Sequence, residues 1–108
     1  MYNESEVREA TLAYFNGDEL ATNVFMTKYC LRDEKGNFVE QTPADMHRRI
    51  AKELARMEDK FRISPTGSLS EEQIYALLKD FKYIVPQGSP MMGIGNDYVN
   101  VSLSNCVV

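Results

Sequence analysis

The stretch QTPADMHRRIAKELARMEDKF, residues 41–61, decides the fold class because it combines a helix start with a helical repeat of apolar residues. Thr42 is a residue type that caps helices, Pro43 suits the first helical position, and Asp45 places negative charge in the first turn. Apolar side chains then recur every three or four residues, at Met46, Ile50, Leu54, Met57 and Phe61. The pattern predicts an amphipathic helix over 43–61, with this stripe buried and His47 on the solvated polar face.

Two further helices are predicted before this stretch. Ser5 can cap a helix over 6–15, and an Asn-Gly-Asp break follows, in which Gly17 suits a left-handed backbone. A second helix is expected over 19–27, with Leu20 on its buried side. The N-terminal part of the chain is therefore expected to be helical throughout.

One more helix is predicted after the central one, and then the sequence changes character. Ser70 and Gln73 stand at the two positions of a capping box, which predicts a helix over 71–81. Beyond it the chain becomes rich in Gly, Pro and β-branched residues, which favours loops and strands over helices. We therefore expect a helical region over 1–85 and a loop-and-strand segment over 86–108.

Composition excludes several classes of protein. The chain has 108 residues and a formal net charge of −4, so it lacks the basic surface that non-specific nucleic-acid binding requires. No apolar run approaches the roughly 20 residues that span a bilayer, and the N-terminus has no secretory signal, so we expect a cytoplasmic protein that does not bind membranes. One histidine and two cysteines are too few for a structural zinc site or a disulfide framework.

The two cysteines have different prospects. Cys106 lies in a predicted strand over 103–108, after a loop rich in Gly, Ser and Asn, where it is either a reactive thiol or a small buried apolar residue. Cys30 follows a predicted helix end and is interpreted as a packing residue. The Gly-Ile-Gly segment at 93–95 is either a loop whose backbone approaches a ligand or a surface turn.

Three blocks of sequence together resemble a known family. The first comprises YFNGDELATNVF at 14–25 and KYCLRDEKG at 28–36, the second is EQTPADMHRRIA at 40–51, and the third comprises FKYIVPQGSP at 81–90 and SLSNC at 102–106. They resemble the N-terminal part of the catalytic subunit of ribonucleotide reductase, and most closely its adenosylcobalamin-dependent type. The SLSNC ending is the most diagnostic block.

The resemblance implies a fold and a set of site residues. It implies a mainly helical N-terminal region that leads into the first strand of a ten-stranded α/β barrel. Cys106 would be one of two thiols that reduce the substrate ribose and become a disulfide, in a thiyl-radical mechanism that supplies deoxyribonucleotides for DNA synthesis. Asn105 and Ser89 would contact the substrate nucleotide. The family often has alanine in place of Cys30, which supports the packing role of that residue.

The resemblance also implies that the remaining catalytic groups lie beyond this sequence. The radical-forming cysteine, the second redox cysteine and the adenosylcobalamin site of the family all follow the last matching block, so we expect the chain alone to be inactive and to bind no cofactor. Its expected partners are the substrate and the remainder of the catalytic subunit. Reasons for an end at Val108 include a split subunit, an intein interruption and a truncated piece. The alternative is a small non-catalytic helical module whose C-terminal strand docks on another chain.

Overall fold

The computed structural model describes residues 1–60 and 69–98, and this part of the chain is built from helices. The elements are α1 (Glu4–Tyr14), α2 (Glu19–Val24), the π-helix η1 (Phe25–Tyr29), α3 (Pro43–Lys60), α4 (Glu71–Leu78), the 3-10 helix η2 (Lys79–Phe81) and α5 (Gly88–Gly93). Within these ranges, extended pairing is limited to isolated bridges of Phe38 with Tyr2 and Arg32. The expectation of a mainly helical fold is confirmed, whereas the predicted barrel strand at 103–108 falls outside the description.

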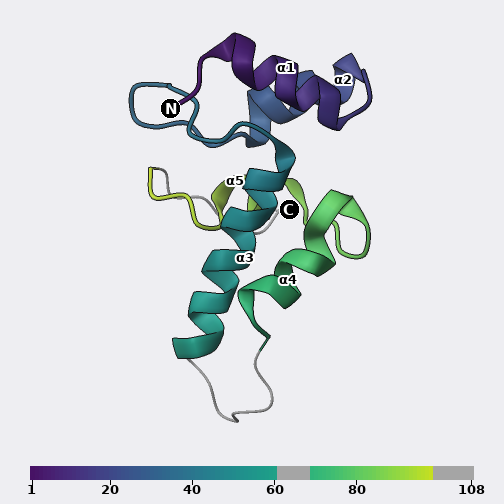
Figure 1. The fold of residues 1–108 in the computed structure, drawn as a ribbon. Coiled ribbons are helices and arrows are strands. Elements are labelled where there is room, and N and C mark those ends of the chain that lie inside the picture. The colour runs from purple at the N-terminus through teal and green to yellow at the C-terminus, as the bar shows by residue number, and fades with distance from the viewer. Residues whose placement is uncertain (61–68, 99–108) are drawn as a thin grey trace, which may run out of the picture.

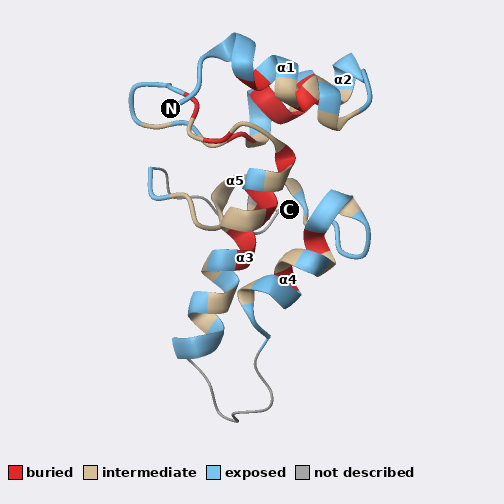
Figure 2. Cartoon of the chain, viewed as in Figure 1, coloured by how far each residue is buried: buried red, intermediate tan, exposed pale blue. Residues whose placement is uncertain are grey.

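The long helix α3 organises the molecule (Figure 1). The helices α1 and α2 lie across the N-terminal end of α3, and α4 packs along it. Helix α5 contacts both α3 and η1. Figure 2 shows the buried residues on the inward sides of α1, α3 and α4 and on the segment between η1 and α3. Among the described residues, the buried apolar side chains of this core are Val7, Phe25, Met26, Cys30, Phe38, Met46, Ile50, Ala51, Ile74, Leu78 and Met91.

Helix α3 begins where the sequence predicts. Pro43 is its first residue, and the Asp45 carboxylate accepts hydrogen bonds from the backbone N–H groups of Gln41 (2.9 Å) and Thr42 (3.2 Å). Thr42 therefore occupies the predicted position before the helix, and the Asp45 side chain satisfies donors at the helix start. The predicted last residue, Phe61, is not among those that the structure describes.

The buried face of α3 is turned relative to the predicted stripe. Met46 and Ile50 are buried as expected, but Leu54 is 37 % exposed. His47 and Ala51 are fully buried instead, which corrects the placement of His47 on a solvated face. The reason is tertiary, because segments from several elements surround the N-terminal half of α3, while the half that carries Leu54 packs mainly against α4.

Two alanine substitutions on α3 measure this turn of the helix. Because Leu54 is partly in solvent, we expect Leu54→Ala to lower the free energy of unfolding by only about 1 kcal/mol. Ile50→Ala removes a side chain that is 1 % exposed and is expected to cost about 2–5 kcal/mol through the cavity it leaves. Urea denaturation of the two variants provides the comparison. Equal losses would place Leu54 in the core and contradict the structure.

The N-terminal helices differ from their prediction at two positions. The cap of α1 is Asn3 rather than Ser5, and its side chain accepts from the Glu6 N–H while the Glu6 carboxylate accepts from the Asn3 N–H. Leu20 is 75 % exposed rather than buried. The chain passes from α2 into the π-helix η1, and there Phe25 and Met26, rather than Leu20, are buried in the core.

Helix α4 starts at its predicted cap but ends early. Ser70 and Gln73 form the expected capping box, with bonds of 3.2 Å and 2.8 Å between side chains and backbone N–H groups. The α-helix stops at Leu78 rather than at residue 81. Asp80 and Phe81 both have a φ of 56°, a left-handed conformation that no regular helix tolerates. This sharp turn aims the Phe81 ring at the His47 ring, with centroids 4.5 Å apart.

His47 is a fully buried imidazole in an apolar setting. Its exposed fraction is 0 %, and neither ring nitrogen has a hydrogen-bond partner within the described part of the chain. Burial lowers the pKa of His47 below its usual 6.5, and the negative charge of Asp80 opposes this only in part. Burial in the folded state therefore favours the neutral imidazole over the charged one.

The free energy of unfolding is expected to depend on pH through His47. The folded pKa lies below the unfolded one, so the unfolded chain takes up the proton first as pH falls. Stability is unaffected above pH 6.5 and decreases below it, by up to about 1.4 kcal/mol per pH unit. Because the chain has one histidine, His47→Leu should remove the slope between pH 6.5 and 5. Equal slopes in both proteins, measured by urea denaturation, would contradict this assignment.

Candidate functional site

The segment that carries Ser89 is a short helix rather than the predicted loop. Helix α5 has six residues, and its end is closed by Asn96, whose backbone N–H donates to the Gly93 carbonyl (3.1 Å) and whose side-chain amide donates to the Met92 carbonyl (3.2 Å). Ser89 lies in the first turn of α5, but its side chain is not described. Asn105 and Cys106 fall in the undescribed residues 99–108, so the structure does not test whether the three predicted site residues meet.

One side chain of α3 holds the end of α5. The Arg49 guanidinium donates to the Ile94 carbonyl through Nη1 (2.6 Å) and to the Met91 carbonyl through Nη2 (2.8 Å), with a longer bond of 3.4 Å from Nη1 to the Met92 carbonyl. These oxygens belong to the last turn of α5 and to its C-cap residue Ile94, where carbonyls lack partners within the helix. The positive charge also suits the negative end of the helix dipole.

Glu40 completes this anchor on the other side. Its carboxylate accepts from Arg49 Nε (2.9 Å), and the two side chains are 6 % and 8 % exposed. The same carboxylate accepts from the Leu31 N–H (3.0 Å), while the Glu40 carbonyl accepts from the Cys30 thiol (3.2 Å). We call Glu40 and Arg49 the buried anchor, because this ion pair joins η1, the segment before α3, and the loop after α5.

The buried anchor is not among the sequence predictions, although the spacing of Arg49 on α3 gives a signal for it. Arg49 lies three residues after Met46 and one before Ile50, and this spacing places it at the edge of the buried stripe of α3. Glu40 lies in an extended segment, with the Val39 N–H donating to the Leu31 carbonyl (2.9 Å). Nothing in the sequence indicates that this segment folds back against α3 next to Arg49.

Two glycines let the segment approach its neighbours closely. Gly95 has a φ of +74°, and a Cβ at this position would lie 2.9 Å from Arg49 Cγ and 3.2 Å from the Arg49 carbonyl. A Cβ on Gly88 would lie 3.2 Å from the Tyr29 hydroxyl. The backbone at Gly95 therefore makes a close approach to Arg49 of the same chain, and the approach of segment 93–95 to a ligand stays a prediction.

Cys30 has the environment of an inert thiol. It is 8 % exposed, and burial together with the nearby Glu40 charge raises its pKa to about 12. At neutral pH the sulfur is therefore protonated, and the thiol is the unreactive form of cysteine. Its hydrogen bond to the Glu40 carbonyl makes it part of the packing around the buried anchor.

The described residues offer no place for the cofactor of the resemblance. No group of three or more His, Cys, Asp or Glu side chains among them could hold a metal ion. The imidazole of His47 is buried against Phe81. We assign no step to a cobalamin group on these residues. In the described ranges, no helix is long and apolar enough to cross a membrane.

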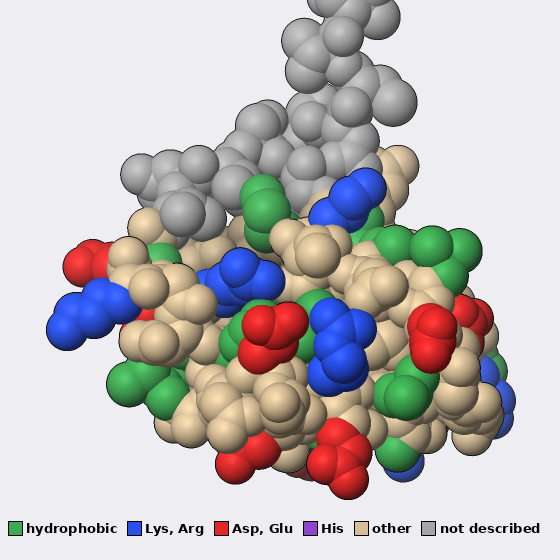
Figure 3. All heavy atoms as spheres, turned by 90° about the horizontal axis from the view of Figure 1, so that it is seen from above, with side chains coloured by type: hydrophobic (Ala, Val, Ile, Leu, Met, Phe, Trp, Pro, Cys, Tyr) green, Lys and Arg blue, Asp and Glu red, His purple; other side chains and the backbone are tan. Residues whose placement is uncertain are grey.

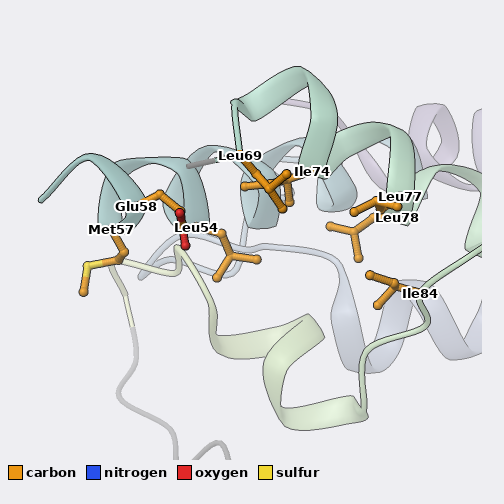
Figure 4. Close-up of a pocket in the computed structure, with 8 residues that line it drawn as sticks. All are labelled: Leu54, Met57, Glu58, Leu69, Ile74, Leu77, Leu78 and Ile84. Atoms are coloured by element: carbon orange, nitrogen blue, oxygen red, sulfur yellow. The ribbon is translucent and has the colours of Figure 1, made fainter. Parts of the chain in front are cut away.

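The surface carries apolar clefts and dispersed charge. A cleft of about 380 Å³ opens between α3 and α4, and Figure 4 shows Leu54, Ile74 and Leu78 directed into it. Among the residues described, its lining includes one charged group, the Glu58 carboxylate. On the face shown in Figure 3, Lys and Arg side chains are interspersed with Asp and Glu side chains rather than separated by sign.

Comparison with known proteins agrees with this architecture. The family model described as "Ribonucleotide reductase, all-alpha domain" matches residues 15–97, which cover α2 to α5 and include both members of the buried anchor. Comparisons with curated proteins and with solved structures gave no significant match. The matched range is more than half of the chain, and the helical fold described above is that of an all-alpha domain. The chain therefore belongs to the ribonucleotide reductase all-alpha domain family.

Proposed function

We propose that this chain is the N-terminal portion of an adenosylcobalamin-dependent ribonucleotide reductase, and that Cys106 is one of its redox thiols. The family match supports the assignment to a ribonucleotide reductase, and the adenosylcobalamin type and the role of Cys106 rest on the resemblance of the sequence blocks. The match ends at residue 97, and the SLSNC block, which resembles the start of the catalytic barrel, begins five positions later at residue 102. The chain would thus supply the helical domain and the first catalytic strand of a cytoplasmic enzyme.

The proposed chemistry defines what Cys106 must do. Reduction of a ribonucleotide replaces a ribose C–OH bond by C–H and releases water. Two thiols supply the two electrons and two hydrogen atoms and become one disulfide, so the balance closes with no other reductant in that step. A third thiol is needed to carry the radical. Ser89 and Asn105 would hold the substrate nucleotide next to Cys106.

The chain by itself has too few thiols for this reaction. It has two cysteines, of which Cys30 is buried with a pKa of about 12. Cys106 is then left as one redox thiol where the chemistry needs a pair and a radical-bearing partner. The remainder of the catalytic subunit would provide the missing thiols and the cobalamin site.

Reconstitution tests the proposal directly. The coding region after residue 108 is sequenced, the polypeptide it encodes is purified, and deoxyribonucleotide formation is measured with a ribonucleotide, adenosylcobalamin and a dithiol reductant. We expect no product from the 108-residue chain alone and steady turnover from the combined parts. Product from the chain alone, or none from the correctly folded combination, would overturn the proposal.

A further inference from the structure

We propose that Arg49 is a positioning residue for the substrate nucleotide, which holds the segment that carries Ser89 without touching the substrate. This inference rests on the proposed function for the identity of the ligand. Its structural half, that Arg49 fixes the segment 88–96 on α3, stands on the contacts of the buried anchor alone.

The Arg49 guanidinium donates all of its hydrogen bonds to groups of this chain. Nε donates to Glu40, Nη1 to the Ile94 and Met92 carbonyls, and Nη2 to the Met91 carbonyl at 2.8 Å, with longer bonds of 3.4 Å to Glu40 and the Tyr29 carbonyl. The side chain is only 8 % exposed. A phosphate or ribose cannot reach this group, so any influence on the substrate must pass through α5.

Helix α5 depends on contacts with other elements for its position. A helix of six residues is too short to be stable alone, and no side chain caps its N-terminus. Its packing depends on Met91, which is 8 % exposed, and on neighbours in η1 and α3. The bonds from Arg49 therefore fix the last turn of α5, and because α5 has only six residues, they also set the position of Ser89 in its first turn.

The contact between residue 49 and the end of α5 requires arginine. A guanidinium has five donors in a planar fork, and here Glu40 fixes the orientation of the fork while the remaining donors reach carbonyls along the end of α5. A lysine ammonium has the same charge but cannot reach Glu40 and these carbonyls together. Arg49→Lys therefore keeps a buried cation beside Glu40 and removes the hydrogen bonds to the carbonyls at the end of α5.

Hydrogen exchange of the full 108-residue chain tests the structural half. We expect Arg49→Lys to speed exchange of the Met91, Ile94 and Asn96 amides at least about tenfold, the ratio that corresponds to about 1.4 kcal/mol. The Val7 amide in α1 should not change. The matched control is Arg48→Lys, because Arg48 is the neighbouring α3 residue and its ion pair with Glu72 is largely exposed. In Gly95→Ala the added Cβ would lie 2.9 Å from Arg49 Cγ and displace that side chain, so exchange of the same amides should also become faster.

Kinetics of the reconstituted reductase test the substrate half. We expect Arg49→Lys to raise the KM for the ribonucleotide about tenfold while kcat stays within about twofold, since Arg49 does not take part in the chemistry. Arg48→Lys should leave both values unchanged. A purely structural role for Arg49 would lower the amount of active enzyme, and so kcat, without changing KM.

The outcomes separate this inference from the proposed function. Unchanged exchange at 91–96 in both Arg49→Lys and Gly95→Ala overturns the positioning role. Faster exchange with an unchanged KM overturns the link to substrate. If the reconstituted wild-type protein forms no product, the proposed function and the substrate half are both overturned, while faster exchange would still support the anchoring of α5 by Arg49.

Discussion

Cys106→Ser is expected to abolish turnover of the reconstituted reductase with a dithiol reductant, whereas Cys30→Ala leaves turnover nearly intact. Serine cannot form the disulfide that carries away the two electrons of the reaction, so the substrate ribose stays unreduced. Cys30 is buried and protonated, and its thiol bonds a backbone carbonyl, so it has no access to a nucleotide. The measurement is deoxyribonucleotide formation by the two variants side by side.

Circular dichroism provides the control, because both variants must be folded for the comparison to hold. The reverse pattern, an inactive Cys30→Ala and a fully active Cys106→Ser, would show that the redox role lies on the other cysteine. The same pair of variants separates the enzyme from a non-catalytic interaction module. A module whose C-terminal strand docks on a partner tolerates serine at position 106, while the reductase does not.

Glu40→Ala is expected to lower the free energy of unfolding by about 3–5 kcal/mol, because it leaves the buried Arg49 charge without its counter-ion. The Leu31 N–H loses its acceptor in the same change. This loss is a large part of the stability of a domain of this size, and the variant is expected to be partly unfolded at 37 °C. Urea denaturation at neutral pH provides the measurement.

The matched control is Glu53→Ala on α3, which removes the partner of Arg56 in a pair that lies at the surface. We expect it to cost at most about 1 kcal/mol, the usual range of solvent-exposed ion pairs. Similar losses for Glu40→Ala and Glu53→Ala would mean that Arg49 reaches water once Glu40 is gone. That result would contradict the enclosed position of the buried anchor.

Local sequence signals predict the starts of α3 and α4 well, but they predict other helix ends and the packing of the helices poorly. The start of α3 at Pro43, the capping box of Ser70 and Gln73, and the left-handed Gly17 each depend on a few neighbouring residues, and all are observed. Leu20 and His47 depend on which element packs against them, which helical periodicity does not specify. Their exposed fractions of 75 % and 0 % are the reverse of the prediction.

The candidate site divides in the same way. The resemblance names Ser89, Asn105 and Cys106 through short motifs, and the family match supports the domain that precedes them. The buried anchor has no motif, because it forms only when residues 40, 49 and 91–94 come together in the folded chain. The sequence favours a loop rather than helix α5, because Gly and Pro stand at its start. The helix forms because tertiary contacts stabilise it.

The bonds from Arg49 to the end of α5 have a consequence for the order of folding. They join residues 42 and 45 positions apart in the chain, whereas α3 and α4 are close in sequence. Closing the longer loop has the higher entropic cost, so the α3–α4 pair is expected to form first and α5 to dock late. A contact absent from the transition state affects the unfolding rate, so Arg49→Lys should accelerate unfolding in stopped-flow experiments and leave the refolding rate unchanged. An equal change in both rates would place the docking of α5 within the folding nucleus.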